Sequence, residues 1–314
     1  MFLFQYEDPK KAMLEEVKKG LRREQKALSS KYFYDKRGSE LFEAICELDE
    51  YYLTRCELEI MRCHNDEICN FLGKHCLLVE LGSGSSLKTR LLLENMDNLA
   101  AYAPLDISEK FLKETVHKLE KEFPGLNVIP VAADYTRHFD IPDIPFARRT
   151  VLYYPGSTIG NFPRSQARAF LERFSSLLSE GDGLLIGVDA LKDVPVLEAA
   201  YNDSKGVTAA FNKNMLNHLN EELDTDFDID LFTHKAWFNS GKKRIEMHLI
   251  SDTEQTVTIQ DITFHFSKGE SIHTENSCKY SDSDFRSLIS GLFEVVQMWT
   301  DSRSYFSLYY LRKQ

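Results

Sequence analysis

The sequence predicts an α/β fold in which a mostly parallel sheet carries helices on both faces, joined to a second, α+β domain. Between residues 77 and 188, short apolar runs alternate with segments of helical periodicity, which is typical of β–α–β units. A glycine-rich turn, Gly82-Ser-Gly84, follows the first apolar run. After residue 220 the alternation gives way to closely spaced strand-like runs, which indicates a separate arrangement of that part of the chain.

The N-terminal region is predicted to be helical. Residues 10–28 are charged and place Met13, Val17 and Leu21 at helical spacing. Residues 41–48 and 55–71 read as two further helices, and we expect residues 51–54 to form the loop between them.

The alternating region supplies the predicted parallel sheet. The expected strands are residues 77–81, 101–105, 128–132, 150–154 and 183–188. The expected helices are residues 87–96, 108–123 and 165–178, with Ser108 as the N-cap of the second. Because each connection between strands is helical, the strands should run parallel.

The last third of the chain is predicted to leave this sheet and then return to it. Residues 194–220 are mostly helical in pattern, and antiparallel strands are expected at 235–239, 244–251, 255–259 and 262–266. A helix at 281–290 and two strands at 294–300 and 305–311 should close the first sheet as a hairpin. The predicted domains are therefore 57–193 plus 279–314, and 1–56 plus 194–278.

The most informative motif is the nucleotide-binding turn in the segment LLVELGSGSSLKTR, residues 77–90. Glu80 ends the first strand, and Asp106 ends the second. Leu87 stands where the dinucleotide fingerprint has its third glycine, and a pyrophosphate needs close backbone approach there, so NAD is disfavoured. An acidic strand end suits a ribose, and S-adenosylmethionine carries a ribose but no phosphate.

Composition excludes several classes of function. The net charge of −11 disfavours nucleic acid as a partner, because an acidic surface repels phosphates. No apolar run approaches the ~20 residues of a membrane span, and the N-terminus lacks the pattern of a signal peptide. We therefore expect a cytoplasmic monomer with no membrane partner. The six cysteines form no Cys-x-x-Cys pair and the nine histidines show no paired metal spacing, so reduced thiols and no metal are expected.

Eight ordered blocks together resemble one known family over nearly the whole chain. They are Lys31–Phe42, Glu50–Arg55, Val79–Arg90, Asp134–His138, Gly156–Asn161, Tyr201–Asn214, Ile245–Met247 and Thr274–Lys279. The chain resembles the L-histidine Nα-methyltransferases of ergothioneine biosynthesis. The resemblance implies a Rossmann-like class I methyltransferase sheet with a substrate-binding domain built from the N-terminal helices and an insertion. It implies trimethylation of histidine to hercynine, with S-adenosyl-L-methionine as methyl donor and S-adenosyl-L-homocysteine as product.

The resemblance also implies how the cofactor is held. Its residues would be Gly82, Gly84 and Lys88 in and after the turn, Asp106 on the ribose, and Asp134 with Tyr135 at the adenine. A carboxylate can accept hydrogen bonds from both ribose hydroxyls, which agrees with the role given to Asp106. Tyr135 is phenylalanine in typical members, so a ring is kept.

The amino acid would be held by a second set of side chains. By resemblance, Tyr51, Asn161 and Tyr201 bind its carboxylate, while Tyr34, Asn161 and the carbonyl of Gly156 surround its amine. Neutral groups suit an amine that must react as the free base, because a nearby carboxylate would favour its protonated form.

The imidazole would be recognised by Glu275 and Ser277, with Met247 and Thr208 nearby. Residues two apart on a strand share one face, so one side chain can meet each ring nitrogen.

Other interpretations stay open at this point. The enzyme could methylate the amine of another amino acid, for example a tryptophan derivative as in a fungal alkaloid relative. The protein could also bind S-adenosylmethionine without turnover. Taken alone, Asn161 after Gly160 is typical of a plain turn, and most of the 14 tyrosines should be structural.

Overall fold

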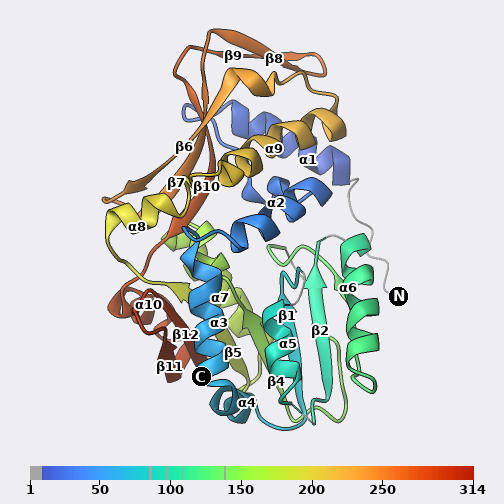
Figure 1. The fold of residues 1–314 in the computed structure, drawn as a ribbon. Helices are drawn as coiled ribbons and strands as arrows, with labels where there is room; N and C mark the ends of the chain where they lie inside the picture. Colours follow the sequence, from blue (N-terminus) through green and yellow to red (C-terminus); the bar gives the residue numbers. More distant parts are fainter. Residues whose placement is uncertain (1–8, 85–86, 97, 108, 138) are drawn as a thin grey trace. The chain divides into compact units, whose positions relative to one another are not determined.

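The computed structural model describes residues 9–84, 87–96, 98–107, 109–137 and 139–314 (Figure 1). The chain divides into two compact units. One contains Leu53–Leu191 with Cys278–Gln314, and we call it the seven-stranded unit. The other contains the residues up to Tyr52 with Lys192–Ser277, and we call it the three-stranded unit. The boundaries expected from sequence, after residues 56, 193 and 278, lie slightly further along the chain.

The seven-stranded unit is built on one mixed sheet with the order β11-β12-β5-β4-β1-β2-β3. Its strands are β1 (Cys76–Leu81), β2 (Ala101–Asp106), β3 (Val131–Ala132), β4 (Arg149–Tyr154), β5 (Gly183–Asp189), β11 (Phe293–Thr300) and β12 (Phe306–Lys313). β1 pairs in parallel with β2 and β4, β2 with β3, and β4 with β5, whereas β12 is antiparallel to both β5 and β11. The expected α/β fold and its closing hairpin are confirmed.

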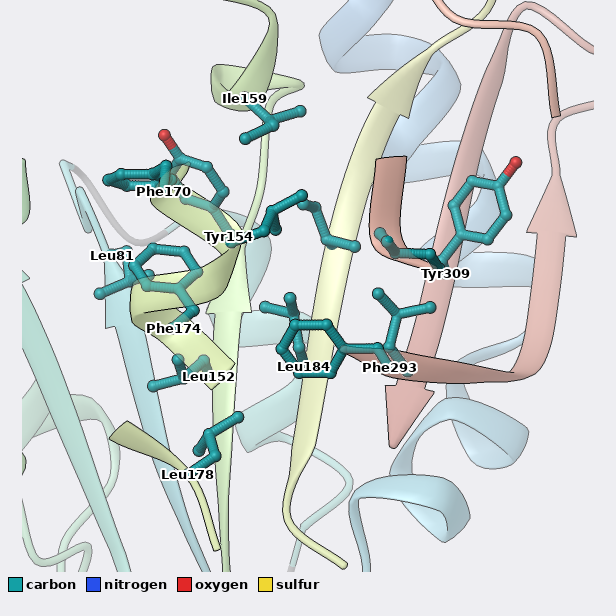
Figure 2. Packing of buried hydrophobic residues seen from close by; sticks show 14 of the residues in the cluster. Leu81, Leu152, Tyr154, Ile159, Phe170, Phe174, Leu178, Leu184, Phe293 and Tyr309 are labelled. Atoms are coloured by element: carbon teal, nitrogen blue, oxygen red, sulfur yellow. The ribbon is translucent and has the colours of Figure 1, made fainter. Parts of the chain in front are cut away.

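Helices cover both faces of this sheet. They are α3 (Tyr52–Cys63), α4 (Asn65–Leu72), α5 (Leu87–Leu93), α6 (Glu109–Glu122), α7 (Arg164–Leu177) and α10 (Asp282–Ile289), with a 3-10 turn, η2 (Thr158–Asn161), after β4. On one face, Phe170 and Phe174 of α7 pack against Leu152 of β4 and Leu184 of β5 (Figure 2). On the other face, the Tyr153 hydroxyl lies 3.3 Å from the sulfur of Met61 on α3. Burial on both faces explains why the parallel strands read as continuous apolar runs.

The three-stranded unit combines helices with two small sheets. Its helices are α1 (Pro9–Leu21), α2 (Lys36–Cys46), α8 (Val194–Ala199) and α9 (Val207–Leu223), with 3-10 turns η1 (Ser30–Phe33) and η3 (Ile229–Leu231). One sheet has the order β10-β7-β6, from Ser271–Cys278, Arg244–Ser251 and Phe232–Asn239. The other pairs β8 (Gln255–Ile259) with β9 (Ile262–Phe266). This is the expected α+β composition.

Four local expectations from sequence were wrong. Residues 51–54 are not a loop, because α3 begins at Tyr52. The single helix expected at 55–71 is two helices, and α4 restarts after His64 with Asp66 and Glu67 in its first turn, where carboxylates favour a helix N-terminus. The strand expected at 128–132 is only Val131–Ala132. The helical stretch expected at 194–220 is interrupted between α8 and α9. The predicted cap Ser108 lies outside the described residues.

None of the helices in the described part of the chain combines the length and apolar character that a membrane crossing requires.

Candidate active site

In the seven-stranded unit, the glycine turn meets the acidic end of the neighbouring strand. Gly82 has a φ of +73° and donates from its N–H to the Leu105 carbonyl at 2.8 Å. The N–H of Gly84 donates to the Asp106 carboxylate at 3.2 Å. A Cβ on Gly82 would lie 3.3 Å from the Tyr135 ring. Three of the predicted cofactor residues, Gly82, Gly84 and Asp106, are thus brought together where parallel strands end, which is where α/β sheets bind ligands.

Glu80, at the end of β1, is a buried acid beneath this turn. Its side chain accepts a hydrogen bond from the Tyr102 hydroxyl on β2. Burial raises the pKa of Glu80 from 4.5 to about 7, although hydrogen bonding and the nearby Lys88 oppose that rise. The carboxyl group is therefore partly protonated near neutral pH.

The segment after β3 is held in place by α7. The Asp134 carboxylate accepts from the Thr136 N–H at 2.8 Å. The guanidinium of Arg173 donates to the carbonyls of Tyr135 and Thr136 at 2.7 and 2.6 Å. The Tyr135 ring stands edge-on to Tyr154, with centroids 5.7 Å apart. The Tyr135 ring therefore lies beside the Gly82 turn, and Asp134 precedes it in the same segment.

Lys88 binds a buried carboxylate that the sequence reading did not identify. Its Nζ lies 2.5 Å from Glu57 Oε2, and the Glu57 side chain is fully buried. The N–H of Gly156 donates to the same carboxylate at 2.9 and 3.1 Å. Gly156 has a φ of +74°, and a Cβ there would lie 3.4 Å from Lys88 Nζ. Glu57 thus joins Lys88 to the loop after β4, and no local pattern in its helix marks that role.

The loop after β4 ends in the η2 turn, and Asn161 is its last residue. Asn161 is half-buried. The turn starts after Ser157, which has a φ of +56° and accepts from the Asp189 N–H at 2.8 Å.

The three-stranded unit brings most of the predicted substrate residues together. The Tyr201 hydroxyl donates to Ser277 Oγ at 2.7 Å. The rings of Tyr51 and Tyr201 meet edge to face with centroids 6.2 Å apart, and both are buried. Burial raises the pKa of Tyr51 well above its ordinary value, and the neighbouring Tyr201, Glu275 and Tyr34 raise it further. These five side chains form one polar cluster.

Tyr34 is positioned by an aromatic neighbourhood. Its ring contacts Phe42 at 5.7 Å and Phe211 at 5.8 Å between centroids. The next residue, Asp35, caps α2 by accepting from the Gly38 N–H at 2.6 Å, and it also accepts from the Asn214 amide at 2.8 Å. Asp35 and Asn214 fall in two of the recognised sequence blocks, but their shared structural role appears only in three dimensions.

Thr208 and Met247 lie on neighbouring elements. Met247 on β7 is buried, and its carbonyl accepts from Thr274 Oγ1 at 3.1 Å, one residue before Glu275. Thr208 is buried in the first turn of α9, and its N–H donates to Asp203 at 2.7 Å.

Gly206 lies in the stretch 194–220 that was expected to be mostly helical, but it stands outside α9. Gly206 precedes α9 with a φ of +73°, a backbone conformation that favours glycine. Its presence is explained by the turn, without any need for a ligand.

Residues 13–313 match a family described as histidine-specific methyltransferase, SAM-dependent. This chain belongs to that family. It is 39% identical to the histidine N-alpha-methyltransferase of Mycobacterium tuberculosis, covering 95% of this chain and 94% of that protein. It is 31% identical to ergothioneine biosynthesis protein 1 of Schizosaccharomyces pombe, covering 96% of this chain but 40% of that longer protein. It is 27% identical to an L-tryptophan methyltransferase of Psilocybe serbica, covering 91% and 88%.

Membership of this family confirms the resemblance, the enzyme class and the use of S-adenosylmethionine that were expected from sequence. The roles of individual residues remain predictions. Among the residues that the structure describes, no three His, Cys, Asp or Glu side chains gather closely enough to hold a metal ion.

Proposed function

We propose that the protein is an S-adenosylmethionine-dependent Nα-methyltransferase that converts L-histidine to hercynine, the first step of ergothioneine biosynthesis. The observation that carries the choice of substrate is the cluster of Tyr51, Tyr201, Glu275 and Ser277, in which Tyr201 binds Ser277 and Glu275 lies near enough to Tyr51 to raise its pKa. We also expect the enzyme to act as a cytoplasmic monomer.

The cofactor fits the residues at the strand ends of the seven-stranded unit. Asp106 would accept hydrogen bonds from the ribose hydroxyls, and Asp134 with Tyr135 would meet the adenine. A Cβ built on Gly84 meets no atom of the described residues within 4 Å, which leaves room for a ligand beside the turn. Lys88 Nζ already pairs with Glu57, so it would attract the cofactor's carboxylate as one member of that ion pair. The bound cofactor supplies a methyl group on a positively charged sulfur.

The chain's part in the chemistry is to present the amine. Tyr34, Asn161 and the Gly156 carbonyl are neutral groups that can bind a free amine without favouring its protonation. These residues would contribute mainly by holding the amine in position toward the methyl group, because alignment alone can remove ~7–11 kcal/mol from a barrier. Small polar partners also allow a methylated nitrogen to turn for the second and third transfers.

The two nitrogens of the imidazole would be bound by one hydrogen-bond donor and one acceptor of the protein. Ser277 Oγ accepts from the Tyr201 hydroxyl, and a hydroxyl that accepts one hydrogen bond can also donate one, so Ser277 would donate to an unprotonated ring nitrogen of the bound substrate. Glu275 on the same strand can accept from the other ring N–H. A site built around such bonds can reject amino acids that lack them by ~10⁴-fold or more.

Methylation of a tryptophan derivative is the alternative, since one relative is named an L-tryptophan methyltransferase. An indole has a single donor and no acceptor, so it would offer no ring nitrogen to which Ser277 could donate.

A mass spectrum tests the proposal. The protein is incubated with S-adenosylmethionine and an equimolar mixture of the twenty amino acids. We expect gains of one, two and three methyl groups on histidine alone. Methylation of another amino acid in preference to histidine would contradict the proposed substrate.

A further inference from the structure

The seven-stranded unit contains a fully buried ion pair that lies outside all the predicted sites. Asp189 is the last residue of β5, and Lys279 follows β10. Lys279 Nζ lies 2.5 Å from Asp189 Oδ2, and both side chains have no exposed surface. Removing two charges from water costs several kcal/mol per ion, which their attraction repays only in good geometry. A pair of this kind contributes little net stability, so its role is better sought in what it positions.

The backbone around this pair is closely tied together. The Tyr280 N–H donates to the Asp189 carbonyl at 3.0 Å, and the Leu191 N–H donates to the Tyr280 carbonyl at 3.2 Å. The end of β5 and residues 278–280 therefore form one rigid corner, with the ion pair inside it.

The η2 turn rests on this corner at two points. The Asp189 N–H donates to Ser157 Oγ at 2.8 Å, directly before the turn. Gly160 lies against Cys278, so that a Cβ on Gly160 would stand only 2.9 Å from the Cys278 carbonyl oxygen. A third anchor comes from Ile159, which is buried in the hydrophobic core (Figure 2).

We propose that Asp189 and Lys279 are positioning residues for Asn161. The ion pair fixes the corner, the corner fixes Ser157 and Gly160, and these fix the turn that ends at Asn161. This inference rests on the proposed function, in which the Asn161 amide meets the substrate's amine and carboxylate. A displacement of about 1 Å at such a group can cost on the order of 100-fold in rate.

The test replaces the whole pair rather than one partner, because a lone buried charge would endanger folding. The variant is Asp189→Leu with Lys279→Met. Lys26→Met with Glu270→Leu is the matched control, because it removes an ion pair of the three-stranded unit that touches none of the proposed site residues. The affinity for S-adenosylmethionine is measured by calorimetry, and kcat and KM are measured with histidine.

We expect the Asp189/Lys279 variant to keep its cofactor Kd within about 2-fold and to lose ~10-fold or more in kcat/KM for histidine. The control should change kcat/KM by less than about 2-fold. The same pair variant is then made in an Asn161→Ala background. If the pair acts through Asn161, it should cost less than about 2-fold there, because the group that it positions is gone.

An equal loss in both backgrounds would overturn the inference, and so would unchanged kinetics of the pair variant. If the pair variant does not fold, Ser157→Ala and Gly160→Ala disturb the same turn. Each is then measured in the parent and in the Asn161→Ala background. Failure of the parent protein to methylate histidine would instead contradict the proposed function, so the two failures are distinguishable.

Discussion

At the scale of single residues, several acidic side chains are buried or fixed by hydrogen bonds and ion pairs. Glu57 is fully enclosed by Lys88 and the Gly156 N–H, and Glu80 lies under the glycine turn. Asp106 receives the Gly84 N–H at the surface of the same turn. The acidic ends of β1 and β2 were recognisable in the sequence as a motif. Glu57 was not, because its partners lie 31 and 99 positions away along the chain and no local pattern records them.

Glu80 should make stability depend on pH. Its pKa is raised to about 7, so the folded state binds a proton more tightly than the unfolded chain does. The free energy of unfolding should therefore fall as pH rises from 4.5 toward about 7. Glu80→Gln cannot ionise and should lack this fall. The free energy of unfolding of the variant, taken relative to that of the parent, should therefore be ~1–3 kcal/mol higher at pH 8 than at pH 5.

Urea unfolding at the two pH values measures this difference. The exposed Glu94→Gln is the control and should track the parent at both. An equal offset between Glu80→Gln and parent at pH 5 and pH 8 would show that Glu80 does not titrate in this range.

Asp106 should contribute directly to cofactor affinity. Asp106→Ala removes a charged acceptor for the ribose hydroxyls, so S-adenosylmethionine should bind more weakly by ~1–3 kcal/mol. Calorimetric titration measures the change, with the exposed Asp143→Ala as control. Unchanged affinity in Asp106→Ala would remove this residue from the site.

Glu275 should set substrate choice without affecting the cofactor. Glu275→Ala should lower kcat/KM for histidine by ~100-fold or more while leaving the cofactor Kd unchanged. Adding Met247→Val trims a buried side chain and should raise activity on tryptophan or phenylalanine relative to histidine. The assay is competitive methylation of mixed amino acids, measured by mass. A double variant that keeps the parent's preference would show that Glu275 does not bind the ring.

At the scale of elements, helices and strands with a regular apolar pattern could be predicted from the sequence, whereas the breaks within them were missed. The strands β1, β2, β4 and β5 carry apolar runs that reflect burial on both faces. The break between α8 and α9 was missed although residues 202–206, NDSKG, are polar and end in glycine, as is typical of a turn. β3 is short because only Val131 and Ala132 pair with β2, a limit that depends on the neighbouring strand. The Asp189–Lys279 contact spans 90 positions and could not be predicted from local sequence.

The start of α9 depends on Gly206 and Asp203. Gly206→Ala should lower the free energy of unfolding by ~1–2 kcal/mol, because a φ of +73° strains a residue with a Cβ even though the space around it is open. Gly241→Ala, in the β6–β7 turn and without a positive φ, is the matched control and should cost less. Chemical denaturation compares the two. Equal costs would mean that the left-handed conformation at Gly206 is not maintained in solution.

At the scale of the whole molecule, each of the two units holds its own set of the residues predicted from sequence. The seven-stranded unit provides the strand-end groups suited to S-adenosylmethionine, and the three-stranded unit provides the tyrosine, glutamate and serine cluster suited to an imidazole. The family and cofactor could be predicted because the motifs are ordered along the whole chain, and residues 13–313 match that family. This distribution of the predicted binding residues is the one expected of a general cofactor fold that carries a specific insertion.

The most direct test of the central claim is where the methyl groups go. The protein is incubated with S-adenosylmethionine and L-histidine, and the product is fragmented in a tandem mass spectrometer. The proposed function predicts a product that has gained three methyl groups and that loses all three together as trimethylamine, because all are bonded to the α-nitrogen. Methyl groups that stay with the imidazole fragment, or a histidine that gains none, would contradict the claim.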